Sequence, residues 1–225
     1  MMKVAAIVPS AGKGKRIRSS IPKPYIRLNN KPILIHTLLR LSKNSSISEV
    51  IVVCNKKEIK RAERIIKRYS LKKVRVVEGG KERKDSVLNG LKNVSKDIDY
   101  VLIHDAVRPF ITKDIIERSL KMAKKYKAAC VGVPVKPTLK YVKKDYIVNT
   151  PDRNDLWEAQ TPQVFKRSLL ENAYRRNSKK TNATDDCMLV ERIGIKPRMV
   201  LGSYSNIKIT TKEDLKLAKL MICGR

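Results

Sequence analysis

Aromatic and acidic residues are scarce in this sequence, and their scarcity excludes several kinds of protein. Aromatic side chains make up 5% of the 225 residues, and no basic-glycine-aromatic motif offers a platform for stacking single-stranded nucleic acid. Only 21 acidic residues stand against 51 lysines and arginines, which gives a net charge of +30. The cations are spread over every segment, so we interpret most of them as solvated surface and expect no specific nucleic-acid partner.

Cysteine and histidine are too few and too far apart for a zinc site of ordinary spacing. No C-x-x-C pair occurs, and the residues concerned are Cys54, Cys130, Cys187, Cys223, His36 and His104. Cys54 and Cys130 lie within apolar runs and are expected to be small buried hydrophobes.

Long apolar runs are also missing. No stretch approaches the roughly 20 residues that cross a bilayer, and the first residues lack a signal-peptide pattern. We therefore expect a cytoplasmic protein that does not bind membranes. Hydrophobic residues still make up 42% of the chain, enough for a core, and the length fits a single domain over residues 1–225.

Apolar β-branched runs alternate with amphipathic stretches through the first 135 residues. Strands are expected at 4–8, 49–54, 74–77, 100–104 and 128–135, and helices at 32–42, 56–69, 82–94 and 112–126. This order predicts an α/β fold: one Rossmann-like, mostly parallel twisted sheet with helices on both faces.

The pattern changes after residue 135. Short β-rich runs at 141–142 and 146–148 flank Lys143-Lys144-Asp145, which predicts a projecting β-hairpin arm over about 136–155. Helices are expected again at 166–176, 184–193 and 211–222, with strands at 199–201 and 207–210.

The first expected strand ends in a loop of small and basic residues, Pro9-Ser10-Ala11-Gly12-Lys13-Gly14-Lys15-Arg16. In an open parallel sheet, ligands bind at the carboxyl ends of strands, where glycines let backbone N–H groups approach phosphate oxygens. The loop is neither a Walker A motif nor a complete dinucleotide fingerprint, which disfavours an ATPase or a dehydrogenase. Shortly after it, Pro22 and Pro24 hold Lys23 in a rigid segment.

The fourth expected strand ends in His104-Asp105-Ala106-Val107-Arg108-Pro109. Asp105 offers a hard oxygen ligand for Mg²⁺, and Arg108 offers a bidentate phosphate clamp. The alternative is a structural Asp–Arg pair at a strand end. His104 is expected to be a buried packing residue rather than a catalyst.

In combination, these motifs resemble the 2-C-methyl-D-erythritol 4-phosphate cytidylyltransferase family, in order and at matching spacing over nearly the whole chain. The resemblance is carried by Pro9 to Arg16, Pro22-Lys23, Glu78-Gly79-Gly80, Asp85-Ser86-Val87, His104 to Pro109, Thr138, Asp152-Arg153-Asn154, Gln160-Thr161-Pro162-Gln163 and Asn206-Ile207-Lys208-Ile209-Thr210.

The resemblance implies an enzyme that transfers CMP from CTP to 2-C-methyl-D-erythritol 4-phosphate and releases pyrophosphate, in non-mevalonate isoprenoid biosynthesis. It implies Mg²⁺ or another divalent cation as cofactor, with Asp105 as its ligand, and a homodimer formed through the arm. The implied nucleotide-binding residues are Ser10, Ala11, Gly12, Gly14, Gly80 and Ser86. The implied catalytic residues are Arg16, Lys23, Arg153 and Lys208, and the implied substrate-binding residues are Ala106, Arg108, Thr138 and Thr161. Thr138 and Arg153 are expected to reach the neighbouring subunit.

Two other functions stay open at this point. A neighbouring branch of the superfamily makes CDP-ribitol from a pentitol phosphate, and the Asp105 region would look much the same there. The run from Asp152 to Trp157 looks more like the methylerythritol branch. The second alternative is a basic nucleic-acid-binding α/β protein, whose affinity would fall steeply with salt.

Overall fold

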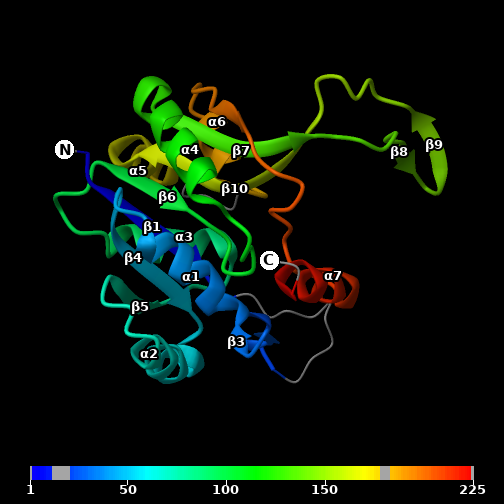
Figure 1. The fold of residues 1–225 in the computed structure, drawn as a ribbon. Helices are drawn as coiled ribbons and strands as arrows, with labels where there is room; N and C mark the ends of the chain where they lie inside the picture. The colour runs from blue at the N-terminus through cyan, green and yellow to red at the C-terminus, as the bar shows by residue number, and fades with distance from the viewer. Residues whose placement is uncertain (1, 12–20, 178–182, 224–225) are drawn as a thin grey trace.

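A seven-stranded sheet forms the centre of the protein (Figure 1), which we describe from a computed structural model covering residues 2–11, 21–177 and 183–223. In spatial order its strands are β11 (Arg198–Leu201), β7 (Ala128–Pro134), β10 (Trp157–Lys166), β6 (Tyr100–Ile103), β1 (Val4–Pro9), β4 (Ile47–Cys54) and β5 (Val74–Glu78). Neighbouring strands are parallel except at β10, which is antiparallel to both β6 and β7. The predicted mostly parallel sheet is confirmed.

Helices cover both faces of this sheet, as predicted. One apolar cluster joins the sheet to α1 (Ile33–Lys43), α2 (Ile59–Arg68) and α4 (Lys113–Tyr126). The other joins it to α3 (Arg83–Lys92), α5 (Arg167–Arg176) and α6 (Asp186–Glu191). Alternate residues of β1 enter opposite clusters, so both sides of the strand are buried and its sequence is apolar throughout.

A third, smaller apolar cluster lies beside the sheet. It contains Leu28 of the short β2 strand (Arg27–Leu28), which pairs with β3 (Lys31–Pro32), and Ala218 of the last helix α7 (Lys212–Cys223). Ile209 belongs to the same cluster, and its backbone N–H donates to the Val107 carbonyl at 3.0 Å. The prediction of a strand at 207–210 is wrong, because these residues have no regular secondary structure. The hydrogen bond of Ile209 with Val107 nevertheless holds the neighbouring Lys208 beside the loop that follows β6.

The predicted hairpin is confirmed and projects away from the sheet (Figure 1). Its strands are β8 (Tyr141–Lys143) and β9 (Tyr146–Asn149), paired antiparallel. Lys144 and Asp145 in the turn have φ values of 49° and 65°, and two consecutive positive values match the hairpin turn whose twist suits the strands. All residues of β8 and β9 are exposed, including the apolar ones.

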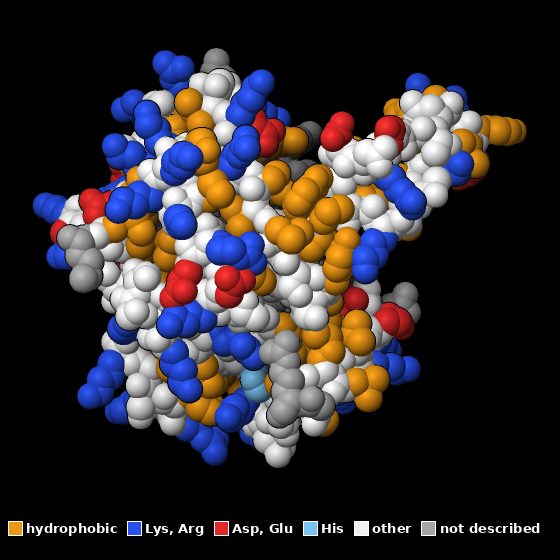
Figure 2. Space-filling view, turned by 45° about the horizontal axis from the view of Figure 1, so that its top comes forward, with side chains coloured by type: hydrophobic (Ala, Val, Ile, Leu, Met, Phe, Trp, Pro, Cys, Tyr) orange, Lys and Arg blue, Asp and Glu red, His pale blue; other side chains and the backbone are white. Residues whose placement is uncertain are grey.

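Lysine and arginine side chains are scattered over the face seen in Figure 2, while apolar side chains mark the arm tip and its base. On this face, the basic side chains are dispersed rather than gathered in one patch. Among the described residues, no helix is both long and apolar enough to cross a bilayer.

Candidate active site

A cavity of about 730 Å³ lies at the carboxyl ends of β1, β4, β5 and β6. This edge is where ligands bind in open α/β sheets. Among the residues that line it are many of the predicted site residues: Ser10, Ala11, Lys23, Gly80, Ser86, Asp105, Ala106 and Lys208. The fold therefore brings together residues from both ends of the chain, as the prediction required.

Asp105 is the centre of the charges in this cavity. Its side-chain oxygen Oδ2 lies 2.9 Å from Nζ of Lys208 and 3.3 Å from Nε of Arg108. Nε of Arg83 lies 3.9 Å from the other oxygen, Oδ1. Burial by itself would raise the pKa of Asp105, but Lys208, Arg83 and Arg108 more than offset this and lower it to about 2. The carboxylate is therefore ionised near pH 7.

A hydrogen-bond network holds Asp105 and Arg108 in place. The Asp105 backbone N–H donates to Oγ1 of Thr161 at 3.1 Å. His104 is fully buried, and its Nε2 lies 3.1 Å from the Arg108 carbonyl, so Nε2–H donates there and Nδ1 accepts from the Thr161 hydroxyl. Burial lowers the pKa of His104 to about 4, which leaves the ring neutral near pH 7. His104, which directly follows β6, is thus buried and hydrogen-bonded, as a packing residue is expected to be.

A second cavity of about 220 Å³ shares Arg83, Asp105 and Lys208 with the first. Arg108 and Thr161, which were predicted to bind substrate, line this second cavity. Asp105 and its cations therefore stand at the boundary between two spaces, which suits a reaction between two bound anions.

The loop before α3 approaches the larger cavity with its backbone. The Gly80 N–H donates to Oγ of Ser86 at 3.2 Å, and Glu82 and Asp85 form a capping box at the helix start. A Cβ at Gly80 would lie 2.2 Å from Cβ of Asp85, so no other residue fits there without moving the helix. Gly79 and Gly80 both line the larger cavity, so the backbone of this loop forms part of its wall.

Some predicted site residues lie elsewhere. Gly12, Gly14 and Arg16 are outside the described residues. Thr138 and Arg153 are exposed near the arm and line neither cavity, and the Arg153 guanidinium donates to the Lys136 carbonyl. Their expected contact with a neighbouring subunit stays a prediction.

Sequence reasoning missed Arg83. This residue lines both cavities, and its Nη1 lies 2.7 Å from Oδ2 of Asp186. The two groups form an ion pair whose orientation is not that of a hydrogen bond. Asp186 is 1% exposed and also accepts a hydrogen bond of 2.6 Å from the Tyr174 hydroxyl. The available signal was the position of Arg83 in the first turn of the helix that follows the Gly79-Gly80 loop.

Comparison with known proteins agrees with this geometry. Residues 4–223 match the model of the 2-C-methyl-D-erythritol 4-phosphate cytidylyltransferase family. The chain belongs to this family. Among cytidylyltransferases of this name, the one from Alkaliphilus metalliredigens is 49% identical over 217 residues, covering 95% of this chain and 90% of the relative. The one from Clostridioides difficile is 47% identical over 221 residues, covering 97% and 93%.

Solved structures of cytidylyltransferases show the same fold. The 4-diphosphocytidyl-2C-methyl-D-erythritol synthase of Anaerococcus prevotii superimposes with a TM-score of 0.88 at 32% identity, covering 99% of this chain and 96% of the other. The 2-C-methyl-D-erythritol 4-phosphate cytidylyltransferase of Thermus thermophilus superimposes with a TM-score of 0.78 at 28% identity, covering 98% of each chain. The similarity extends over the arm as well as the sheet, since nearly the full chain is covered.

Proposed function

We propose that this chain transfers the CMP group of CTP to 2-C-methyl-D-erythritol 4-phosphate. An oxygen of the phosphate monoester attacks the α-phosphorus of CTP, and the bond from that phosphorus to the oxygen bridging the β-phosphate breaks. Pyrophosphate leaves with that oxygen. The observation that carries the proposal is the Asp105–Lys208 pair at 2.9 Å, on the boundary shared by the two cavities.

Positioned charge is the main source of catalysis in this reaction. Two polyanions must meet, and no covalent protein nucleophile is required because the monoester attacks directly. Lys23 and Lys208 border the larger cavity and Arg108 the smaller one, so both reactants would contact cations. We assign Lys23, together with Arg16, to stabilise the charge that develops at the α-phosphate.

We assign the remaining roles from the two cavities together with the family resemblance. We place the triphosphate on the loop of Ser10, Ala11, Gly12 and Gly14, and the cytidine against Gly80 and Ser86. We place the sugar phosphate near Ala106, Arg108, Thr161 and Lys208, with Thr138 and Arg153 supplied by a partner subunit. No observation favours the pentitol phosphate or nucleic acid over these substrates.

The residues fit a divalent cation such as Mg²⁺ that arrives with the triphosphate. Asp105 supplies one ionised hard oxygen to the cavity, and the ion pair of Oδ1 with Nε of Arg83 is long, at 3.9 Å. Mg²⁺ commonly binds one or two carboxylates and takes its other ligands from phosphates and water. Bound there, the ion would neutralise phosphate charge, and Asp105 would orient it.

We also propose that the whole chain acts as one nucleotidyltransferase domain and that it works as a homodimer through the arm. The sheet uses strands from β1 to β11, which supports a single unit. A two-stranded hairpin with exposed apolar side chains is marginal in water, which supports a covering partner. The cytoplasmic location remains a prediction.

The test is pyrophosphate release from each of the four nucleoside triphosphates with Mg²⁺, offered with methylerythritol phosphate or ribitol 5-phosphate. CTP with methylerythritol phosphate should be the best pair by at least about tenfold in kcat/KM. Equal or faster release with ribitol 5-phosphate would reassign the acceptor, and no release with any pair would refute the proposed reaction.

A further inference from the structure

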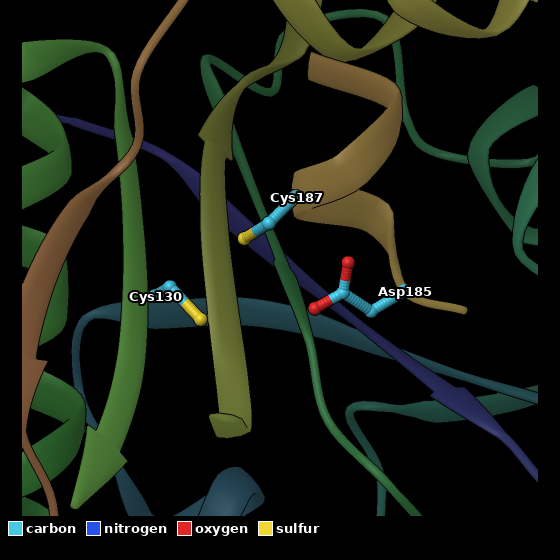
Figure 3. Close-up of side chains that lie close together, drawn as sticks. All are labelled: Cys130, Asp185 and Cys187. Carbon is cyan, nitrogen blue, oxygen red and sulfur yellow. The ribbon is translucent and has the colours of Figure 1, made fainter. Parts of the chain in front are cut away.

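Three potential metal ligands that lie far apart in the sequence meet beside the second cavity. They are Cys130 of β7, Asp185 immediately before α6, and Cys187 of α6. One ligand atom from each lies within 4.8 Å of the others, and Figure 3 shows the three side chains pointing toward a common space. The sequence spacing gave no indication of this group, because the sheet and α6 bring it together.

The group combines buried sulfur with a carboxylate that a solute can reach. Cys130 and Cys187 are each 4% exposed, whereas Asp185 lines the second cavity. A small ion entering that cavity can contact the carboxylate first, and both sulfurs then lie within a few ångströms of it.

Gln163 supplies the surroundings that a thiolate site needs. Its Nε2 donates to Oδ2 of Asp185 at 2.7 Å and lies 3.6 Å from Sγ of Cys130. Its Oε1 accepts from the Asp186 N–H at 3.2 Å, which fixes the direction of the amide. A donor aimed at both a carboxylate and a sulfur stabilises them when they are charged, as residues behind metal ligands do.

The carboxylate also has capacity left for an ion. Oδ1 of Asp185 accepts from the Met188 N–H at 2.9 Å, and Oδ2 accepts from Gln163. Each carboxylate oxygen has two lone-pair positions, so one remains on each. In a tetrahedral zinc site the ligand atoms lie roughly 3.5–3.8 Å apart, so small side-chain movements suffice here.

We propose that Cys130, Asp185 and Cys187 bind one thiophilic divalent cation of the Zn²⁺ type, with water in the fourth position on the cavity side. Two sulfurs and one oxygen select against Mg²⁺, which prefers oxygen ligands only. The site is therefore distinct from the ion proposed at Asp105. A bound cation ties β7 to the start of α6, the helix whose Asp186 holds Arg83.

The test uses Co²⁺ as a spectroscopic probe, with reduced full-length protein under anaerobic conditions. Cys223 is exposed, so all proteins carry Cys223→Ser to remove a competing thiol. We expect one equivalent of Co²⁺ to produce a sulfur-to-cobalt charge-transfer band in the near ultraviolet together with tetrahedral d–d bands. Zn²⁺ should displace the Co²⁺ and abolish both sets of bands.

Three substitutions and one control locate the ligands. Cys130→Ser and Cys187→Ser should each reduce the charge-transfer band to about half or less, because each removes one of the two sulfur ligands. Asp185→Asn should weaken Co²⁺ binding at least about tenfold, and because Asn caps helices as well as Asp, it leaves α6 intact. Cys54→Ser replaces another buried cysteine and should leave the spectrum unchanged.

Circular dichroism verifies that each variant is folded. If a cysteine variant does not fold, the Co²⁺ affinity of Asp185→Asn tests the proposal instead. The proposal is overturned if the folded parent protein gives no charge-transfer band, or if the band persists unchanged in Cys187→Ser. Unchanged Co²⁺ affinity in Asp185→Asn would also overturn it. A further contradicting result would be a protein that takes up no metal but forms a Cys130–Cys187 disulfide on mild oxidation. The two cysteines would then be a thiol pair only.

Discussion

Lys23 lies between two prolines at the edge of the larger cavity, in a short 3-10 turn spanning Lys23–Tyr25. The rigid backbone fixes where the lysine side chain begins, so less entropy is lost when its ammonium group binds the substrate. We predict that Lys23→Ala lowers kcat by about 10²-fold, the usual effect of losing one charge-stabilising donor. Lys31→Ala, at an exposed lysine of β3 outside both cavities, is the control and should behave as wild type in steady-state assays. A Lys23→Ala enzyme within twofold of wild type would contradict the assignment.

His104 makes stability depend on pH. Its folded pKa of about 4 lies below the roughly 6.5 of an unfolded histidine, so the unfolded state binds the proton first as the pH falls. Stability should be fully present above pH ~6.5 and decline toward pH ~4, by about 3 kcal/mol from this residue. Urea unfolding at several pH values measures the slope. His104→Gln should reduce that slope, and an unchanged slope would show that the ring does not titrate this way.

Contacts between residues that are close in the sequence could be predicted, whereas contacts between residues that are far apart in the sequence could not. Asp105 and Arg108 are three positions apart at a strand end, so their ion pair could be inferred from local spacing. Lys208 was placed only through the family resemblance, because nothing near it in the sequence refers to Asp105. Arg83 was missed because its partner Asp186 belongs to a different helix.

Helix α3 lies very close to the sheet, and Gly90 permits this. A Cβ at Gly90 would lie 2.7 Å from Cγ2 of Ile7 and 3.0 Å from Cγ2 of Val53. Alanine would gain about 1 kcal/mol in helix propensity but cost about 1–3 kcal/mol through overpacking. We therefore predict that Gly90→Ala lowers the melting temperature and, because α3 carries Ser86, raises the KM for CTP.

The matched control for this prediction is Lys92→Ala, an exposed position on the same helix. It should change the free energy of unfolding by no more than about 0.5 kcal/mol. Thermal unfolding and CTP titration of both variants provide the comparison. A Gly90→Ala protein more stable than wild type would mean that the helix can move away from β1 without loss.

Elements with regular apolar periodicity were predictable, and β10 was not. Helix α4 begins as expected, since Oγ1 of Thr112 accepts from the Ile115 N–H at 3.3 Å and caps it. Strand β10 is rich in polar residues and contains Pro162, so its sequence does not alternate like a strand. Its buried Gln163 is satisfied by Asp185 and by the Asp186 N–H, partners that only the folded chain supplies.

At the scale of the whole molecule, the proposed association of two copies depends on the arm. Tyr146 is 79% exposed and Ile147 63%, large apolar surfaces for a two-stranded hairpin. We predict that the double variant Tyr146→Glu with Ile147→Glu sediments as a monomer while wild type sediments as a dimer. Lys143→Ala, on the same arm, should remain dimeric. Identical sedimentation of wild type and the double variant would refute an interface on the arm.

The same variant tests whether the active site depends on a partner. Thr138 and Arg153 line neither cavity of their own chain. If they complete the site of the partner subunit, the monomeric variant should lose most of its activity while its thermal stability changes little. A fully active monomer would show that both residues are dispensable for catalysis.

The central claim is that one ionised carboxylate, shared by two cavities, organises the charges between which CTP and the sugar phosphate react. Its most direct test is pyrophosphate release from CTP and methylerythritol phosphate, comparing wild type with Asp105→Asn. The control is Asp114→Asn, which breaks an exposed ion pair with Arg118 on α4. We predict rapid release by wild type and by the control, and a loss of about 10²-fold or more in Asp105→Asn. Equal rates in wild type and Asp105→Asn, or no release by wild type, would contradict the account.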